Sequence, residues 1–263
     1  MFVSKLKFTT MKKDIFTIFA FAIIALFTTS CDPNQPEEID YNKLVVNTWR
    51  LSTINDSYIA SDKMIIYNID ADGTMLRALG SANGGWMECP DFHYTVNTHY
   101  LTLEGTDPQN NEWTIELDIT KISSKSMSFA VRSIKKNGML QTVNNNVYTF
   151  IKNEDKGYAS QLVGTWQCKE TTANVGETPL FFVEIKSDGT YTYYDYNSAN
   201  DTWTPSFTTQ YFIYGEVLTH NYLNTYHCWI VYRNDVNKFV LKSNAENGNL
   251  VEYTFQRVDG IPQ

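Results

Sequence analysis

The sequence predicts an all-β protein made of two tandem, small, antiparallel up-and-down β-barrels of about eight strands each. The first observation is an internal repeat, since one pattern of residues occurs twice along the 263-residue chain. The second is a series of short segments with period-two alternation, separated by turn residues, which is typical of a barrel or a sandwich. The third is that no window longer than about ten residues after the N-terminal 30 has helical periodicity. A β-sandwich of other topology is the alternative.

The repeat has an offset of 116 or 117 residues over most of its length and of 105 residues at its last motif. Asp-Gly-Thr occurs at 72–74 and again at 188–190, and Tyr-Thr-Phe occurs at 148–150 and at 253–255. Most of the matching residues are aromatic or glycine: Trp49, Gly73, Trp86, Leu101 and Trp113 recur as Trp166, Gly189, Trp203, Leu218 and Trp229. We therefore expect each copy to be one module with its own core.

Nearly every segment after residue 43 is predicted to be a strand or a turn. The segment 113–119 shows the pattern best, because apolar and polar residues alternate along it as they do in a half-buried strand. Gly73 supplies the positive φ that a tight connection needs. The predicted strands are 49–53, 64–69, 74–79, 92–96, 100–104, 113–119, 126–132 and 147–152, then 183–185, 191–193, 212–218, 227–232, 238–242 and 250–257.

The N-terminal segment 1–30 has the order of a secretory signal peptide. Lys12 and Lys13 precede an apolar run at 15–27, and small residues follow at 28–30. A membrane-spanning helix needs about 20 residues, and this run is shorter. The expected organisation is a signal peptide at 1–30, a flexible tether at 31–43, a first domain at 44–153, a linker at 154–161, a second domain at 162–258 and a tail at 259–263.

Cys31 stands at the expected cleavage point. The segment resembles a bacterial lipobox, in which the cysteine after the cut carries diacylglycerol, although Thr28 stands where such boxes usually have leucine. The resemblance implies an outer-membrane lipoprotein held by Cys31, facing the periplasm or the medium. Cleavage at an ordinary signal site is the alternative. The polar stretch after Cys31 is typical of a tether.

Charge argues against one class of partner. Without residues 1–30 the chain has 17 basic and 28 acidic residues, a net charge of −11. Nucleic acid and anionic lipid surfaces attract basic proteins, so an acidic exterior disfavours both. We expect no nucleic-acid partner.

The ends of each module carry a known combination. Gly164 and Trp166 open the second module and Arg257 closes it, which resembles the lipocalin and calycin barrels. In that family a Gly-x-Trp at the first strand packs against a basic side chain near the barrel's end, a cation–π contact of about 0.5–2 kcal/mol. The resemblance implies the structural plug pairs Trp166–Arg257 and Trp49–Lys152. The chain is similar to lipocalin-like lipoproteins of Gram-negative bacteria, which carry such domains singly or in tandem.

Aromatic residues are the candidate ligand-binding groups. Trp86 and Trp203 each follow a loop of small and polar residues, and Tyr191, Tyr193 and Tyr194 crowd one strand. Such residues line a pocket or stack on a sugar ring, but they also serve as core residues. A small hydrophobic ligand inside the barrels is the first hypothesis. The alternative is an interaction module with solid barrels, which binds an envelope protein or a polysaccharide through exposed aromatics.

The remaining chemistry-bearing residues give weaker signals. Cys168 and Cys228 lie in the same module, so an exported chain allows a disulfide between them, and small buried hydrophobes are the alternative. The four histidines lack the spacing of a zinc site, and we expect neither a metal nor another cofactor. The sequence has no nucleophile elbow and no phosphate-binding loop. We therefore expect a binding protein without catalytic activity.

Overall fold

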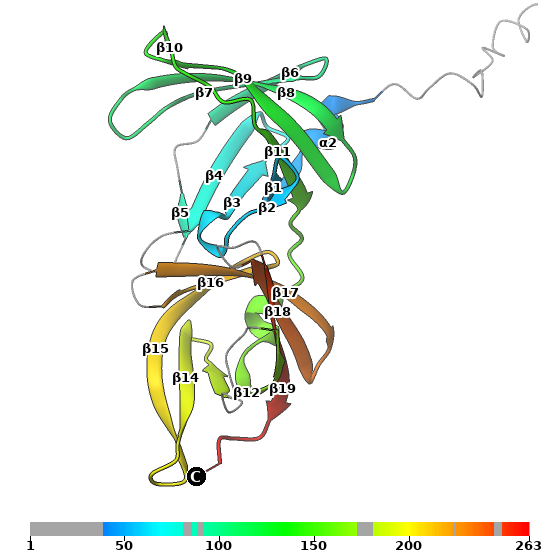
Figure 1. Cartoon of the computed structure of the whole chain (residues 1–263). Helices are drawn as coiled ribbons and strands as arrows, with labels where there is room; N and C mark the ends of the chain where they lie inside the picture. Colours follow the sequence, from blue (N-terminus) through cyan, green and yellow to red (C-terminus); the bar gives the residue numbers. More distant parts are fainter. Residues whose placement is uncertain are drawn as a thin grey trace, which may run out of the picture. The chain divides into compact units, whose positions relative to one another are not determined.

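The computed structural model describes residues 39–80, 86–88, 92–172, 181–222, 225–244 and 249–262. Residues 40–263 form one compact unit. This unit contains two closed, antiparallel, eight-stranded β-barrels in tandem, which confirms the predicted fold class (Figure 1). The expected signal peptide at 1–30 and Cys31 lie outside the described residues.

The first barrel follows the short helix α2 (Tyr41–Val45). Each strand of the ring pairs with its sequence neighbour in the ring, β9 pairs with β8 and β11, and β11 closes the barrel on β1. The eight strands of the ring are β1 (Asn47–Ile54), β3 (Ile65–Ile69), β4 (Thr74–Gly80), β6 (Phe92–Asn97), β7 (Tyr100–Thr106), β8 (Glu112–Ile122), β9 (Ser126–Lys136) and β11 (Val147–Lys152). Three short strands pair with the rims, β2 (Ser57–Tyr58), β5 (Trp86–Glu88) and β10 (Met139–Leu140), and η1 (Ser61–Lys63) is a 3-10 turn.

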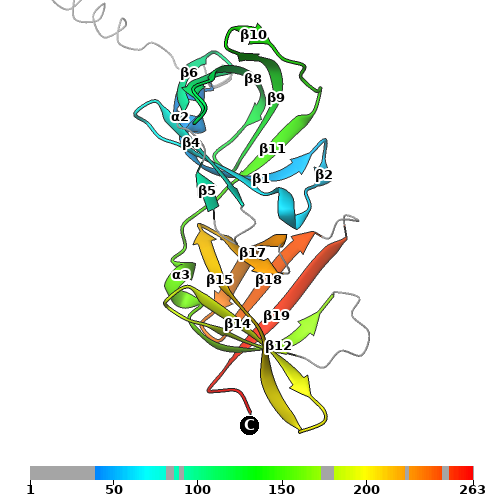
Figure 2. The ribbon, with the colours of Figure 1, turned by 90° about the vertical axis from the view of Figure 1, so that its left-hand side faces the viewer.

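The second barrel follows the helix α3 (Tyr158–Gln161), which lies inside the segment expected as a linker. Its strands pair in sequence order and β19 closes on β12 (Figure 2). They are β12 (Gly164–Thr171), β13 (Phe182–Ile185), β14 (Thr190–Asn197), β15 (Thr202–Tyr214), β16 (Val217–Tyr222), β17 (Thr225–Asp235), β18 (Lys238–Asn244) and β19 (Leu250–Val258).

One predicted strand is wrong. The segment 212–218 is not a single strand, because a tight turn at Gly215 and Glu216 separates β15 from β16. Gly215 has a φ of +61°, and a Cβ there would overlap the side chain of Asn153. The turn is only two residues long and apolar residues flank it on both sides. A reading of hydrophobic alternation therefore passes over it.

The repeated Asp-Gly-Thr is the same turn in both barrels. The carboxylate of Asp72 accepts a hydrogen bond from the Thr74 amide at 2.9 Å, and Asp188 does the same for Thr190 at 2.9 Å. Gly73 and Gly189 have φ values of +91° and +85°, which glycine adopts without steric cost. The turn residue is thus required by backbone geometry in both copies.

A tyrosine holds each of these turns from the next strand. The Tyr94 amide donates to the Gly73 carbonyl, and its hydroxyl donates to the Asp70 carbonyl, both at 2.8 Å. Tyr211 donates in the same way to the carbonyls of Gly189 and Lys186. The repeat therefore extends to hydrogen bonds that the sequence match alone does not show.

The tryptophan of the first strand is buried at one end of each barrel. Trp49 and Trp166 have no exposed surface, and each indole N–H donates at 2.8 Å to the carbonyl four residues earlier. That carbonyl belongs to the residue where the short helix meets the strand. Helix and strand are therefore joined by a buried hydrogen bond at the closed end of each barrel.

The two barrels pack against each other through apolar side chains. Val217 and Cys228 of the second barrel belong to the same hydrophobic cluster as the core of the first. The Tyr226 ring lies so close to Gly80 that a Cβ at that position would overlap it. The Tyr226 hydroxyl donates to the Asp62 carbonyl. The seam between the copies thus combines apolar packing with a hydrogen bond from Tyr226 to Asp62.

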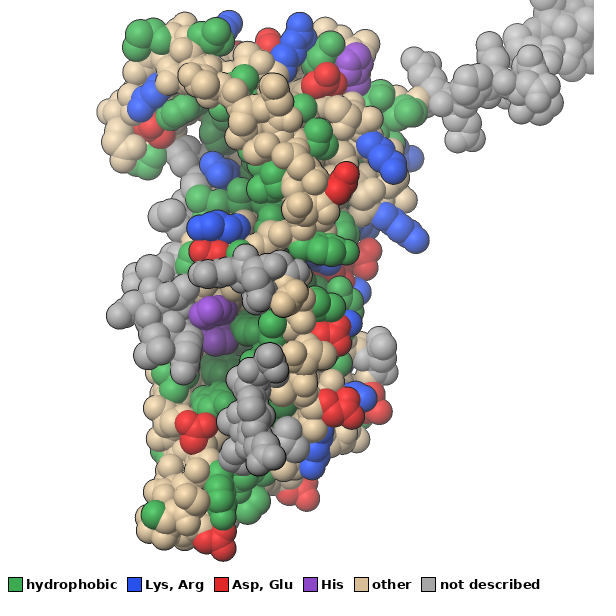
Figure 3. Space-filling view, viewed as in Figure 1, with side chains coloured by type: hydrophobic (Ala, Val, Ile, Leu, Met, Phe, Trp, Pro, Cys, Tyr) green, Lys and Arg blue, Asp and Glu red, His purple; other side chains and the backbone are tan. Residues whose placement is uncertain are grey.

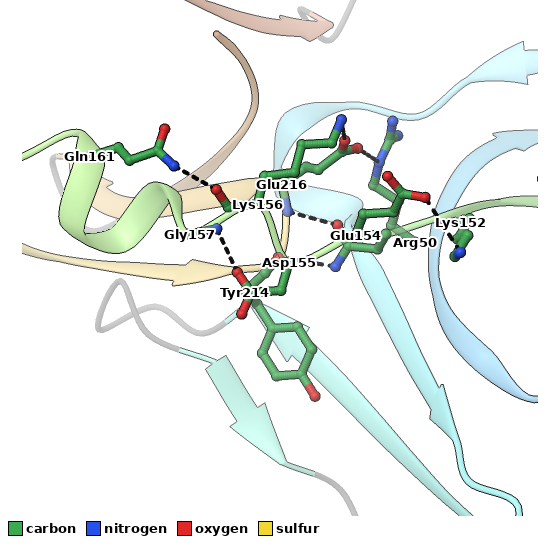
Figure 4. A network of polar contacts seen from close by, with 10 residues as sticks. Arg50, Lys152, Glu154, Asp155, Lys156, Gly157, Gln161, Tyr214 and Glu216 are labelled. Carbon is green, nitrogen blue, oxygen red and sulfur yellow. Dashed lines mark hydrogen bonds and ion pairs between the residues drawn. The ribbon is translucent and has the colours of Figure 1, made fainter. Parts of the chain in front are cut away.

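A polar network ties the linker to this seam (Figure 4). Glu216 lies 3.7 Å from the Nε of buried Arg50 and forms an ion pair with Lys156. The Asn153 side chain donates to the Tyr214 carbonyl at 3.0 Å and accepts from the Glu216 amide at 2.9 Å. Removing one member of such a buried pair leaves an uncompensated charge, which is destabilising. We therefore expect these residues to stabilise the contact between the copies.

Candidate functional site in the second barrel

Ring contacts identify the side chains inside the second barrel. Tyr191 on β14 and His220 on β16 stack with centroids 5.0 Å apart, although β15 separates their strands. Trp229 on β17 meets Tyr253 on β19 edge to face at 5.4 Å, across β18. Because neighbouring strands are about 4.8 Å apart, these pairs meet on the concave side of the sheet. All four side chains therefore face the interior.

Aromatic rings continue from the closed end toward this region. Trp166 contacts Phe239 at 4.6 Å, and Phe239 stacks on Phe255 at 4.7 Å. Phe181 lies edge-on to Phe255 at 5.7 Å and stacks on Tyr193 at 4.4 Å. Side chains thus fill the closed half of the barrel, and the interior changes from phenylalanine to tyrosine, histidine and tryptophan beyond Phe181.

Among the residues that the structure describes, two buried polar atoms in this second half have no hydrogen-bond partner. They are the Nδ1 of His220 and the Nε1 of Trp229. His220 lies directly opposite His227 in the β16–β17 register, and Trp229 is two residues further along β17, so the atoms share one face of one hairpin. Leaving a buried donor or acceptor unpaired costs about 1–3 kcal/mol. A partner that supplies those hydrogen bonds would recover that cost.

Electrostatics make this region uncharged at neutral pH. Burial, with a smaller contribution from His227, lowers the pKa of His220 to about 4. Burial also lowers the pKa of His227, whose Nδ1 lies 3.3 Å from the Ser61 hydroxyl. On the face of the molecule that Figure 3 draws, histidine side chains lie beside a hydrophobic area. The site offers one indole donor and neutral imidazole nitrogens, which suit a neutral polar group.

The structure brings together two of the five aromatic candidates. Tyr191 is buried in the core, and Tyr193 packs inside beside Phe181. Tyr194 points to the other face, where its hydroxyl donates to Glu184 at 3.2 Å. Trp203 lies edge-on to Phe182 at 4.7 Å and beside Tyr196, away from the interior set.

The fifth aromatic candidate is Trp86, and two interior residues, His220 and Trp229, were not among the candidates. The backbone of Trp86 pairs with Gly80 in β5, and its side chain lies outside the described part of the structure. The sequence singled out neither His220 nor Trp229 as a ligand group. Trp229 has a counterpart in Trp113, so in the sequence it stands out only as part of the repeat. The only sequence signal for His220 was its distance of seven residues from His227, which means nothing until β16 and β17 pair.

The plug of the second barrel has the predicted contact. The Arg257 guanidinium lies over the Trp166 ring, 4.1 Å from its centre, and donates to the carbonyls of Val163 and Gln161 at 2.9 and 3.1 Å. Gly164 has a φ of +146°, and a Cβ there would overlap the guanidinium. The glycine of Gly-x-Trp is therefore required so that the arginine can reach the indole.

The first barrel uses the same register without the same contact. Lys152 lies opposite Trp49, as Arg257 lies opposite Trp166. Its described contact is an ion pair with Glu154 at 3.4 Å, and Asn47 replaces the glycine. The ammonium group is a compact, well-hydrated charge, so it stays with a surface carboxylate.

The disulfide allowed by the sequence is not formed. Cys168 and Cys228 are free and buried. Cys168 belongs to the core of the second barrel, whereas Cys228 belongs to the cluster at the seam, so the two thiols lie in different places. Burial raises the pKa of Cys168 to about 11 and that of Cys228 to about 12. Both act as small buried hydrophobes in this fold.

Within the described ranges, no group of three or more His, Cys, Asp or Glu side chains could hold a metal ion. No helix in the same part of the chain is long and apolar enough to cross a membrane. No family model and no curated protein matches this chain. The tandem of closed eight-stranded antiparallel barrels fits a lipocalin-like fold.

Proposed function

We propose that this chain is a lipid-anchored lipoprotein of the bacterial outer membrane that binds a small, mainly hydrophobic ligand in its second barrel without catalysis. One observation carries the proposal. The Nδ1 of His220 and the Nε1 of Trp229 are buried on the inner face of the β16–β17 hairpin and have no hydrogen-bond partner among the described residues. Tyr191 and Tyr253 flank them inside the barrel. An apolar lining with a few convergent polar atoms is the usual composition of a ligand site.

The chemistry of these atoms describes the ligand. The Trp229 indole only donates, so the ligand must carry an acceptor such as a carbonyl or hydroxyl oxygen. With the pKa of His220 near 4, the imidazole is neutral at pH 7 and offers no charge to a carboxylate or phosphate. A flat, uncharged molecule with one polar edge fits this set best, because the ring of Tyr191 provides a stacking partner.

The test uses N-phenyl-1-naphthylamine, a neutral fluorescent probe, and its displacement by pairs of neutral competitors that differ by one carbonyl group. Trp229→Phe keeps an aromatic ring and removes the donor. We expect this change to lower the affinity for the carbonyl competitor by about fivefold to tenfold, because a hydrogen bond of about 1–1.5 kcal/mol is lost. The affinity for the hydrocarbon competitor should be unchanged.

The matched control is Trp203→Phe, because Trp203 packs against Phe182 away from the interior set. The control variant should bind both competitors like the parent chain. If the parent chain does not take up the neutral probe, or if both variants lose the carbonyl preference equally, the second barrel is not the site.

Attachment through Cys31 has its own test. Metabolic labelling with a palmitate analogue should tag the parent chain, and Cys31→Ala should remove the tag. An untagged parent chain would refute lipidation. A single acyl chain binds membranes weakly, whereas the several chains of a mature bacterial lipoprotein hold firmly.

A second function is favoured by the outer face of the second barrel. Tyr196 is 37% exposed and lies 5.3 Å from Trp203, and Tyr194 stands on the same strand as Tyr196. Aromatic rings beside carboxylates suit a polysaccharide or a protein partner of the cell envelope. Replacing Trp203 and Tyr194 by alanine should abolish retention on immobilised envelope glycan without lowering the thermal midpoint. Unchanged retention would exclude this face.

A further inference from the structure

The hairpin that joins β9 to β10 ends in two exposed apolar side chains. Asn137 and Gly138 form its turn, with φ values of +49° and +77°, and Met139 and Leu140 are the two residues of β10. Met139 is 66% exposed and Leu140 is 72% exposed. Neighbouring residues of a strand point to opposite faces, so the tip is apolar on both faces. Figures 1 and 2 draw β10 at the outer margin of the first barrel.

Lysine and tryptophan side chains lie directly behind this tip. Met139 pairs with Lys136 on β9, and Lys136 pairs with Trp113 on β8, so the three side chains form one row across the sheet. The Lys136 ammonium lies 5.1 Å from the centre of the Trp113 ring. Leu140 pairs with Lys135, which adds a second charge on the opposite face. Apolar side chains followed by tryptophan and lysine are typical of the boundary between lipid and water.

The segment around the hairpin is basic, in contrast to the rest of the chain. Residues 119–153 contain six basic and no acidic side chains, whereas the chain beyond residue 30 has a net charge of −11. The six are Lys121, Lys125, Arg132, Lys135, Lys136 and Lys152. Two carboxylates lie near the tip. That of Asp107 accepts hydrogen bonds from the Trp113 indole at 3.0 Å and the Asn111 amide at 2.8 Å, and Glu112 is exposed at the start of β8. The acidic surface as a whole argues against broad contact with an anionic membrane, and this segment is the local exception.

The shape of the tip favours a lipid bilayer over a protein partner. Met139 and Leu140 lie on opposite faces of β10, and a flat protein surface would cover one of them. Lipid surrounds a protruding segment on all sides, so a bilayer buries both side chains. The long side chains of Lys135 and Lys136 then reach the phosphate groups, while the apolar tip reaches the boundary of the acyl chains.

We propose that the β9–β10 hairpin docks the first barrel on an anionic phospholipid surface, with Met139 and Leu140 below the head groups and Lys135 and Lys136 at the phosphates. This contact goes beyond the function proposed above, because it needs neither acyl chains at Cys31 nor a ligand inside a barrel. On a lipid-anchored chain it would fix which part of the first barrel faces the membrane.

The test uses the chain from residue 31 onward with Cys31→Ser, so that no acyl chain contributes. Co-sedimentation is measured with vesicles of phosphatidylglycerol and phosphatidylethanolamine, and with vesicles of phosphatidylcholine alone. The parent chain should bind the anionic vesicles about tenfold more tightly, because lysines near an anionic surface are attracted to it. Lys135→Gln with Lys136→Gln should remove this preference and its decline with added salt.

Removal of the apolar tip is the second arm. Met139→Ser with Leu140→Ser should lower the affinity for the anionic vesicles by about tenfold or more, because two apolar side chains are no longer buried. The matched control is Val236→Ser with Leu250→Ser, since these residues of the second barrel are 69% and 52% exposed and lie outside the basic segment. The control variant should bind like the parent chain. Thermal unfolding checks that each variant keeps its fold.

Three outcomes overturn the proposal. The first is that the parent chain binds neither kind of vesicle. The second is that the tip variant keeps its affinity, or loses no more than the control variant. The third is self-association of the parent chain in ultracentrifugation that disappears in the tip variant without any vesicle binding, which would assign the hairpin to a contact with a second copy.

Discussion

The duplicated plug allows one experiment to be run twice within the same molecule. In the second barrel the Arg257 guanidinium stacks on Trp166 at 4.1 Å and donates three hydrogen bonds to backbone carbonyls, of which the one to Val236, at 3.4 Å, is the longest. A cation–π contact contributes about 0.5–2 kcal/mol, and a hydrogen bond from a charged group about 1.5–3 kcal/mol when buried. Because Arg257 is partly exposed, we take the lower part of both ranges and expect Arg257→Met to cost about 3 kcal/mol.

The twin substitution should cost far less. Lys152 occupies the same register position and pairs with Glu154 at the surface. An exposed ion pair contributes about 0–1 kcal/mol, so Lys152→Met should lower the free energy of unfolding by less than about 1 kcal/mol. Urea titration followed by far-ultraviolet circular dichroism and tryptophan fluorescence measures both variants. Equal losses in the two would refute the assigned role of Arg257.

A double-mutant cycle sharpens the same argument. Gly164→Ala adds a Cβ that overlaps the guanidinium in the parent chain. Part of its cost should therefore disappear when Arg257 is already methionine, and the remainder is the backbone strain of alanine at a φ of +146°. A coupling energy above about 1 kcal/mol supports direct contact. Strict additivity of the two substitutions would contradict it.

Three more predictions concern other parts of the molecule. The pKa of His220 falls from 6.5 to about 4 on folding, so the free energy of unfolding is highest above pH 6.5 and declines by about 3 kcal/mol as the pH falls through 4. Urea midpoints measured from pH 7 to pH 4 should show this decline in the parent chain. They should depend less on pH in His220→Gln. Glu216→Gln leaves Arg50 without its counter-charge, so it should lower the free energy of unfolding, measured by calorimetry, by about 3 kcal/mol. A loss below about 1 kcal/mol would show that the polar network does not stabilise the fold. In a chain whose other two cysteines are serine, Cys168 and Cys228 should resist iodoacetamide at pH 8 until the protein unfolds; rapid native labelling would contradict their burial.

Much of the scaffold was predictable because its signals are local. Asp-Gly-Thr marks a turn whose hydrogen bonds run between residues two apart, and the same geometry forms in both copies. The plug tryptophans bond to carbonyls four residues away. The turn inside the segment 212–218 was not predictable for the converse reason. Its turn at Gly215 is fixed by contact with Asn153, which is more than sixty residues distant.

The candidate sites were less predictable because they depend on which face of a strand is inside. Tyr193 and Tyr194 are adjacent in sequence, yet one packs in the interior and the other bonds to Glu184 on the outer face. His220 and His227 become a pair only in the β16–β17 register.

The sequence by itself determined the all-β architecture, the duplication, the turns and the plug residues, because short-range periodicity and backbone geometry fix them. Only the tertiary structure decided the rest. Closure of each barrel, through β11 on β1 and β19 on β12, defines an inside. Contact between the copies buries Val217 and Cys228 at the seam. Cys168 belongs instead to the core of the second barrel, so the two cysteines lie in different clusters. Burial of a polar atom without a hydrogen-bond partner among the described residues is a relation between distant segments, and it exists for the Nδ1 of His220 and the Nε1 of Trp229 only once the strands have paired.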